Sequence, residues 1–179
     1  MLEALITSKT RIKLLLKFFL NSNSSSYLRN LETEFGESSN AIRLELNKFE
    51  QAGLLNSELD GNKKRFRANT HHPLFNDIHN ILLKHLGFDK IVETVIDQLG
   101  NLDKVFVTGA FARGTDHQVI DLIFVGNEIN KNYLLKLVDK VERLISRKIR
   151  YMVMGSDEFR MYEAGLGDEE VLLLWDKEK

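Results

Sequence analysis

The apolar residues of positions 8–53 recur every three or four places, which is the spacing of helices that bury one face. Three such stripes follow one another, separated by polar or glycine-containing breaks: Ile12, Leu15, Leu16 and Phe19; Leu28, Leu31 and Phe35; and Ile42, Leu46 and Phe49. Gly36 follows the second stripe and Gly53 the third, where a left-handed residue ends a helix favourably. Two short helices, a tight turn and a third helix predict a helix-turn-helix.

Cap and turn residues set the limits of these helices. Thr7 or Ser8 is placed to cap the first helix, and Ser38 or Ser39 is placed to cap the third. The polar run at 21–26 predicts one loop and one cap between the first two helices.

A β-hairpin is predicted directly after the third helix. Segments 54–59 and 64–69 have strand character and flank residues 60–63, whose Asp-Gly pair is typical of a hairpin turn. Four of the five positions from 63 to 67 are cations: Lys63, Lys64, Arg65 and Arg67. Because side chains alternate along a strand, the two arginines share one face and Phe66 takes the other, where it anchors the hairpin.

The open face of the third helix carries polar side chains suited to DNA: Ser38, Ser39, Asn40, Arg43, Asn47 and Lys48. Short polar groups near a helix N-terminus, with an arginine one turn on, fit base edges and phosphates in a major groove. The solvated face of a core helix has the same composition, so the helix alone leaves both interpretations open. The basic hairpin favours DNA, because it can straddle a phosphate backbone and release counterions.

Residues 38–55 resemble the recognition helix and wing entry of the ArsR/MarR type of winged helix-turn-helix, with 50–54 matching the E-x-A-G-L of that family. The resemblance spans about residues 8–70. It implies a double-stranded DNA partner, bound by a homodimer on two half-sites, and it makes residues 1–70 the DNA-binding domain. A winged helix that binds another protein is the alternative.

A helical connector is predicted at 71–100. Its first helix has Pro73 at N1, where a missing N–H costs nothing, and ends at Gly87. Its second helix ends at Gly100 and has a wide apolar stripe, which serves either as a bridge between domains or as a dimer seam: Ile91, Val92, Val95, Ile96 and Leu99. Four histidines lie in the connector: His71, His72, His79 and His85. No two are spaced i, i+4 and no acid completes a site, so no metal ligand is predicted.

Strands alternate with helices in the rest of the chain. The strands are predicted at 105–107, 119–125, 149–154 and 171–175, and the helices after Asn130 and from Ser156. This alternation predicts a small α/β sheet domain over residues 101–179. The whole chain is therefore predicted to be α+β: a winged helix-turn-helix, a helical connector and a small α/β domain.

The second half resembles the minimal nucleotidyltransferase domain of the DNA polymerase β superfamily. That family has Gly-Ser, a spacer, Asp-x-Asp on a strand and a third acid on a later strand. The matching residues here are Gly109, the Ala112-Arg113-Gly114 turn and Ile120-Asp121-Leu122. The whole chain also resembles predicted regulators that join a winged helix to such a domain through a His-Pro-Leu-Phe helix, here residues 72–75.

Three departures from the family pattern bear on function. Ala110 stands at the catalytic serine, Val119 at the first metal-binding acid, and the strand of the third acid offers Arg150. Two-metal phosphoryl transfer needs ions about 3.5–4 Å apart, bridged by carboxylates. Residues i and i+2 of a strand share a face, so valine at 119 leaves Asp121 alone. We therefore predict no catalytic residue, no metal and no cofactor, and we expect Arg150 to form an ion pair with Asp121.

Three functions stay open for the second half. It is either a structural or dimerising part of a DNA-binding regulator, or a sensor that binds a nucleotide or another anion at a helix start. The sensor residues would be Gly109, Ala110, Arg113, Gly114, Asp121 and Arg150. The alternative is an active Mg²⁺-dependent nucleotidyltransferase that transfers NMP to a protein or small molecule. Glycine turns alone are weak evidence, because they also shape a strand-to-helix bend.

Composition narrows these functions only slightly. The 179 residues, 43% of them apolar, suffice for two small cores, and the absence of cysteine excludes disulfides and thiolate sites. Residues 1–70 hold 11 Lys and Arg against 8 Asp and Glu, whereas 71–179 hold 14 against 18. No apolar run approaches the roughly 20 residues that cross a bilayer, and no secretion signal is recognisable, so a cytoplasmic protein is expected.

Overall fold

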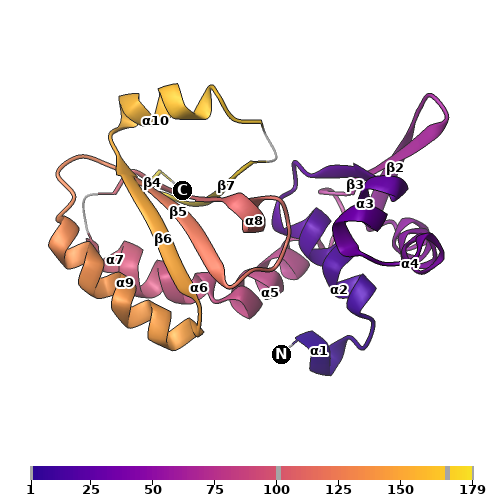
Figure 1. Ribbon diagram of the computed structural model, residues 1–179, viewed down its shortest axis with the longest axis horizontal. Helices are drawn as coiled ribbons and strands as arrows, with labels where there is room; N and C mark the ends of the chain where they lie inside the picture. The colour runs from indigo at the N-terminus through magenta and orange to yellow at the C-terminus, as the bar shows by residue number, and fades with distance from the viewer. Residues whose placement is uncertain (1, 100–101, 168–169, 179) are drawn as a thin grey trace. The chain divides into compact units, whose positions relative to one another are not determined.

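The computed structural model describes residues 2–99, 102–167 and 170–178. It divides into two compact units, Met1–Leu82 and Leu83–Lys179. Each unit contains helices and one sheet, so the protein has the predicted α+β fold (Figure 1). The division falls inside helix α5, Phe75–Leu86, so the segment predicted as a connector contributes to both units. None of the described helices is long and apolar enough to cross a membrane.

The N-terminal unit contains the predicted helix-turn-helix. After the short α1 (Leu2–Leu5), α2 (Lys9–Leu15) continues into a π-helical turn, η1 (Leu16–Leu20). Helix α3 (Leu28–Phe35) and helix α4 (Ser39–Gln51) follow. Ser8 caps α2, Ser38 caps α4, and Gly36 ends α3 at a φ of +64°. These caps confirm the boundaries that the sequence predicted.

The core of this unit is built from the three predicted stripes. Phe19 of η1 lies edge-on to Phe49 of α4, with ring centroids 6.4 Å apart, and also packs against Phe75 at 5.7 Å. Leu31 of α3 and Ile42 of α4 are completely buried. This burial fixes which side of α4 faces inward, because aromatic and branched side chains interdigitate in one rotation of the helix.

A three-stranded sheet completes the N-terminal unit. Its strands are β1 (Ser25–Tyr27), β2 (Leu55–Asp60) and β3 (Lys63–Ala68), in the order β1-β3-β2 and all antiparallel. The predicted hairpin is present, but each strand lies one residue nearer the turn than predicted, so that only Gly61 and Asn62 connect them. Strand β1 is a correction, because residues 21–26 were predicted to form only a loop and a cap. Ser26 is buried opposite Phe66, so β1 covers the backbone edge of β3 that would otherwise be open.

The predicted start of α5 was wrong by two residues. Pro73 was placed at N1, but α5 begins at Phe75, and its first helical hydrogen bond runs from Ile78 N to Leu74 O at 3.0 Å. Pro73 lies instead in a turn, where the His72 imidazole accepts the N–H of Leu74 at 3.1 Å. The helix ends before Gly87, at a φ of +84°, as predicted.

The C-terminal unit alternates helices with strands. A continuous helical segment made of α6 (Phe88–Ile91), η2 (Val92–Ile96) and α7 (Asp97–Leu99) comes first. Gly100, its predicted end, lies outside the described residues. The later elements are β4 (Lys104–Thr108), α8 (Gly109–Ala112), β5 (Val119–Val125), α9 (Lys131–Ile145), β6 (Lys148–Met154), α10 (Ser156–Glu163) and β7 (Val171–Asp176).

These strands form one four-stranded sheet in the order β6-β5-β4-β7, with only the β5–β6 pair parallel. The segment α6–α7 and α9 cover one face of this sheet, and α10 lies on the other (Figure 1). On the α10 side, Phe159 stacks on Phe106 of β4 at 4.3 Å. Ile91, Val95 and Ile96 are buried within the unit, so the apolar stripe of this helix is core and is not an open dimer seam.

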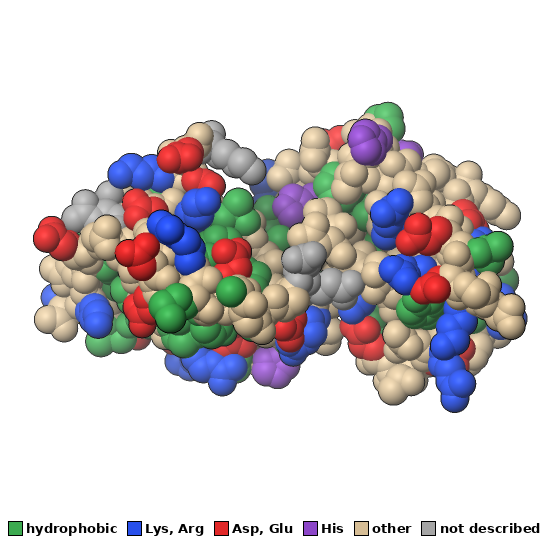
Figure 2. All heavy atoms as spheres, turned by 90° about the horizontal axis from the view of Figure 1, so that it is seen from above, with side chains coloured by type: hydrophobic (Ala, Val, Ile, Leu, Met, Phe, Trp, Pro, Cys, Tyr) green, Lys and Arg blue, Asp and Glu red, His purple; other side chains and the backbone are tan. Residues whose placement is uncertain are grey.

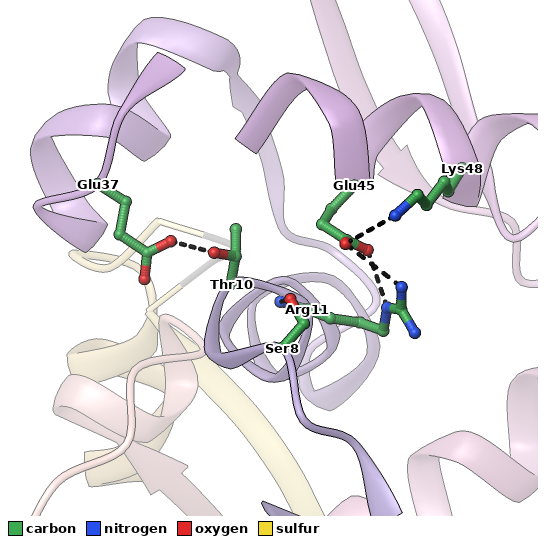
Figure 3. Close-up of polar contacts among 6 residues, drawn as sticks. All are labelled: Ser8, Thr10, Arg11, Glu37, Glu45 and Lys48. Atoms are coloured by element: carbon green, nitrogen blue, oxygen red, sulfur yellow. Dashed lines mark hydrogen bonds and ion pairs between the residues drawn. The ribbon is translucent and has the colours of Figure 1, made fainter. Parts of the chain in front are cut away.

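Polar contacts join helix α2 to α4 and to the turn between α3 and α4 (Figure 3). Arg11 donates from Nε to Glu45 Oε2 at 2.8 Å and from Nη2 to Oε1 at 3.3 Å. Lys48 also donates to Glu45 Oε1, at 3.1 Å. Thr10 and Lys13 donate to Glu37. The hydrogen bond from Arg11 lowers the pKa of Glu45, against the opposing effect of its burial.

Replacing Arg11 by Met tests this link. Because the folded pKa of Glu45 lies below its unfolded value, the pair stabilises the unit above about pH 4.3, and this contribution is lost as the pH falls through the folded pKa. We expect Arg11→Met to lower the free energy of unfolding by about 1–2 kcal/mol at neutral pH. The variant should also lose less stability on acidification. Urea unfolding, followed at the amide NMR signals of α2 and α4, measures both quantities.

Arg29→Met is the matched control, because Arg29 is exposed on α3 and has no carboxylate partner among the described residues. It should leave both the neutral stability and the acid dependence unchanged. An Arg11→Met variant with the acid dependence of the native chain would contradict the role given to Glu45.

Candidate functional site

The polar face of α4 is open to solvent as the sequence predicted, but its residues are not equivalent. Asn40, Arg43 and Asn47 are exposed. Ser38 is engaged as the cap, since its hydroxyl accepts the N–H of Ala41 at 3.3 Å. Lys48 is exposed but lies 3.1 Å from the Glu45 carboxylate. The arginine and the two asparagines are therefore the side chains of α4 most available to a partner.

A groove of about 450 Å³ brings α4 together with the hairpin and the start of α3. Arg43 and Asn47 line it from α4, and Lys63 and Lys64 line it from β3. Its floor is apolar and is formed by Leu28, Leu46 and Phe66. The groove therefore gathers residues from both parts of the predicted DNA-binding set, although they lie 16 or more positions apart in sequence.

Four further polar or aromatic residues line this groove that were not predicted to belong to the site: Tyr27, Arg29, Glu32 and Asn62. Arg29 stands in the first turn of α3 and Asn62 in the hairpin turn. The apolar pattern of the sequence does not identify them. A helix start and a hairpin turn are, however, places from which such proteins contact DNA, and this could have pointed to Arg29 and Asn62.

The hairpin cations divide between two faces. Phe66 is buried on the face that turns toward α4, and Lys64 lies on that same face. Arg65 and Arg67 lie on the other, where Arg65 stands opposite Glu58 of β2 and Tyr27 of β1. The predicted alternation is confirmed, and it means that the four cations do not form one surface.

Two of these four cations are bound to carboxylates of the same unit. Lys64 Nζ lies 2.7 Å from Glu50 Oε2, and Arg65 bonds to Asp60. The hydrogen bond from Lys64 lowers the pKa of Glu50, and those from Tyr27 and Arg65 lower the pKa of Asp60. On the face of the protein seen in Figure 2, acidic and basic side chains are interspersed.

The C-terminal unit has a second pocket, of about 360 Å³, around Asp121. Asp121 of β5 is in register with Arg150 of β6 and with Thr108 of β4. Arg150 Nε lies 2.5 Å from Asp121 Oδ1, so the predicted ion pair is present. The Asp121 side chain is 17% exposed and that of Arg150 77% exposed. Arg113 reaches the same pocket from the end of α8.

Gly109 is required by its contact with Asp121. It has a φ of +68°, and a Cβ there would lie 2.4 Å from Asp121 Oδ2. The turn continues through Ala110 of α8 to Gly114, which is buried at a φ of +77°. The glycines therefore shape a bend that brings the backbone against the carboxylate.

The pocket contains one acid that was not predicted, Glu170. It precedes β7 in sequence and accepts the N–H of Gly167 at 3.0 Å. Asp116 lies elsewhere, bound to Arg147 at 2.6 Å. Within the described part of the chain, no group of three or more His, Asp or Glu side chains is arranged to hold a metal ion.

No family model and no curated protein matches this chain. Three solved structures share part of its fold. A candidate nucleotidyltransferase from Sulfolobus solfataricus is 28% identical, over 54% of this chain and 85% of the other, with a TM-score of 0.37. The protein AF1382 from Archaeoglobus fulgidus is 19% identical over 46% and 93%, with a TM-score of 0.38. A candidate transcriptional regulator for arsenical resistance is 22% identical over 50% and 88%, with a TM-score of 0.32.

All three TM-scores lie below 0.5, so these likenesses carry no argument about function. One of the three is named for a nucleotidyltransferase and another for a transcriptional regulator.

Replacing Gly109 by Ala tests the geometry of the second pocket. The new methyl group collides with Asp121 and forces a left-handed alanine, so we expect a loss of about 2–4 kcal/mol in the free energy of unfolding. Trp175, the only tryptophan, lies on β7 and reports unfolding of this unit by its fluorescence. Gly165→Ala is the control, because its Cβ would meet only Tyr162 O at 3.5 Å. Equal stability of the two variants would contradict the packing described.

Proposed function

We propose that this protein is a DNA-binding transcriptional regulator that acts as a homodimer, and that its nucleotidyltransferase-like unit is not catalytic. The observation that carries the proposal is the groove in which Arg43 and Asn47 of α4 stand with Lys63 of the wing. All three side chains are exposed and, in the described structure, none pairs with a carboxylate. An arginine and an asparagine on one helix face, beside a lysine, are the groups that read bases and hold phosphates.

The shape of the N-terminal unit supports this assignment. Helix α4 has 13 residues and buries one stripe, so its opposite face can enter a major groove about 12 Å wide. Arg43 suits guanine and Asn47 suits adenine, each through two hydrogen bonds. In this proposal Lys63 and Arg67 of the hairpin contact the flanking phosphates.

The charges of the second pocket argue against catalysis. A two-metal site needs carboxylates that bridge the ions, whereas Asp121 has a valine two positions before it and an arginine on its Oδ1. Arg150 already supplies the positive charge next to this carboxylate. We assign the unit a structural or dimerising role.

Ligand sensing is a second candidate for this unit. The observation that favours it is a pocket of about 360 Å³ with Arg113 and Arg150 on its wall and Tyr162 beside them. Two guanidinium groups near an aromatic ring suit a nucleotide or a similar anion.

DNA binding is tested with two sets of variants on a mixed-sequence duplex, by fluorescence anisotropy at several salt concentrations. Lys63→Ala/Arg67→Ala should weaken binding on all sequences alike and reduce the slope of log K against log salt by about 0.9 for each phosphate that is no longer neutralised. Arg43→Ala should also weaken the preference between duplexes, by about 1–3 kcal/mol on a preferred site.

Lys140→Ala is the control, since Lys140 is an exposed lysine of α9 in the other unit. It should leave the affinity and the salt slope nearly unchanged. If Arg43→Ala and Lys63→Ala/Arg67→Ala bind DNA as the native chain does, the proposed surface is wrong.

The second unit is tested with ATP. We expect no Mg²⁺-dependent incorporation of label from α-labelled ATP, because Asp121 is the only acid on its strand face. Incorporation that Asp121→Ala abolishes would instead establish an enzyme. A rise in melting temperature with ATP in the absence of Mg²⁺, abolished in Arg113→Ala, would establish the ligand sensor.

A further inference from the structure

The hairpin of β2 and β3, residues 55–68, is here called the wing. Two of its four cations, Lys64 and Arg65, are bound to carboxylates of the same unit. Arg65 bonds to Asp60 through Nη2, donates from Nε to the Tyr27 hydroxyl at 3.0 Å and lies over the Tyr27 ring at 5.4 Å. Lys64 bonds to Glu50 at 2.7 Å. Within the described residues, Lys63 and Arg67 have no comparable carboxylate partner.

Each of the two carboxylates is itself fixed by a second donor. The Ser57 hydroxyl donates to Glu50 Oε1 at 2.5 Å, and the Tyr27 hydroxyl donates to Asp60. Asp60 is also the last residue of β2, paired with Lys63 of β3 at the two-residue turn, so its backbone position is fixed by the hairpin. The negative charges therefore stay beside the wing when the cations move.

The pairs themselves are weak enough to open. The side chains of Asp60 and Arg65 are 49% and 38% exposed, and surface ion pairs of this kind contribute little in water. A DNA phosphate offers an arginine the same paired oxygens as a carboxylate does. It can therefore take Arg65 or Lys64 from its internal partner.

We infer that Asp60 and Glu50 are internal counter-ions that compete with DNA phosphates for Arg65 and Lys64, and that they thereby limit the affinity of the wing for DNA. The inference rests on the DNA-binding function proposed above and adds two acidic residues that regulate it. Since each carboxylate remains next to the phosphate that displaces it, these two interactions neutralise little net charge. In the salt dependence of DNA binding, the wing of the native chain should therefore behave as if only Lys63 and Arg67 were cations.

The experiment compares Asp60→Asn with Glu58→Gln in the full chain, on the same mixed-sequence duplex and over the same range of salt. Glu58 lies on the same strand, but its carboxylate is 4.0 Å from Arg65, so Glu58→Gln removes one negative charge without releasing the arginine. We expect Asp60→Asn to bind about fivefold more tightly than Glu58→Gln at low salt, with a slope steeper by up to about 0.9.

A second substitution shows whether the gain comes from the released arginine. Arg65→Ala should change little in the native background and should remove the gain in the Asp60→Asn background, so the two effects are strongly non-additive. Glu50→Gln, tested with Lys64→Ala, gives the same comparison on the other face of the hairpin. It keeps the test valid if Asp60→Asn unfolds the turn.

The possible results distinguish a failure of the counter-ion inference from a failure of the proposed DNA-binding function. The inference is overturned if the native protein binds duplex but Asp60→Asn and Glu50→Gln bind no more tightly than Glu58→Gln. The DNA-binding function is unaffected by that result. Additive effects of Asp60→Asn and Arg65→Ala overturn the inference as well. Native protein and variants that all fail to bind duplex at low salt overturn both.

Discussion

The burial of one stripe of α4 is the constraint on which the N-terminal unit depends. Ile42 and Leu46 are almost completely buried, and Phe49 lies against the ring of Phe19. A helix fixed on one side by this packing has no freedom to rotate, so its other side is fixed too. The positions of Arg43 and Asn47 on the open face therefore follow from the apolar stripe. The hairpin is held to the same core by Phe66, and this places its tip beside that face.

Charges in this protein are mostly balanced close to where they occur. Glu45 takes Arg11 and Lys48, Glu50 takes Lys64, and Asp60 takes Arg65. The buried carboxylate of Glu45 contributes to stability through its bond to Arg11, whereas the exposed pairs add little. Their effect lies in the surface potential, which is reduced wherever a carboxylate stands next to a lysine or arginine. The number of basic residues in the sequence thus overstates the positive surface potential of the N-terminal unit.

The sequence predicted the elements well, because their signals are local. Apolar period, caps such as Ser38 and glycines such as Gly87 identify a helix from its own residues. Strand β1 has no such signal, since its serines are typical of turns and become a strand only by pairing with β3. Pro73 is compatible with a helix start and with a turn, and the hydrogen bond from Leu74 to His72 decides for the turn.

The sites were predicted less completely, because their residues come together from distant parts of the chain. The pair of Asp121 and Arg150 was predicted, since both positions fall on strands that the motif already aligned. The pairing of Lys64 with Glu50 depends on how the hairpin packs on α4, and Glu170 enters its pocket through the segment before β7. A sequence motif identifies the site residues of one segment. The residues of other segments that face them are known only once the fold brings the segments together.

The glycine turn of the second unit is explained by its packing, without any substrate. Gly109 is forced by the carboxylate of Asp121, whose Oδ2 occupies the space of a Cβ. The turn therefore persists as long as Asp121 is there, whether or not phosphate is handled. The charge of the pocket points the same way, because Arg113 and Arg150 are balanced by Asp121 and Glu170. A neutral wall neither concentrates Mg²⁺, as paired carboxylates do, nor attracts a polyphosphate by net charge. An anion that binds Arg150 competes with Asp121 for it, and displacing Asp121 costs little because the arginine is 77% exposed and exposed ion pairs are weak.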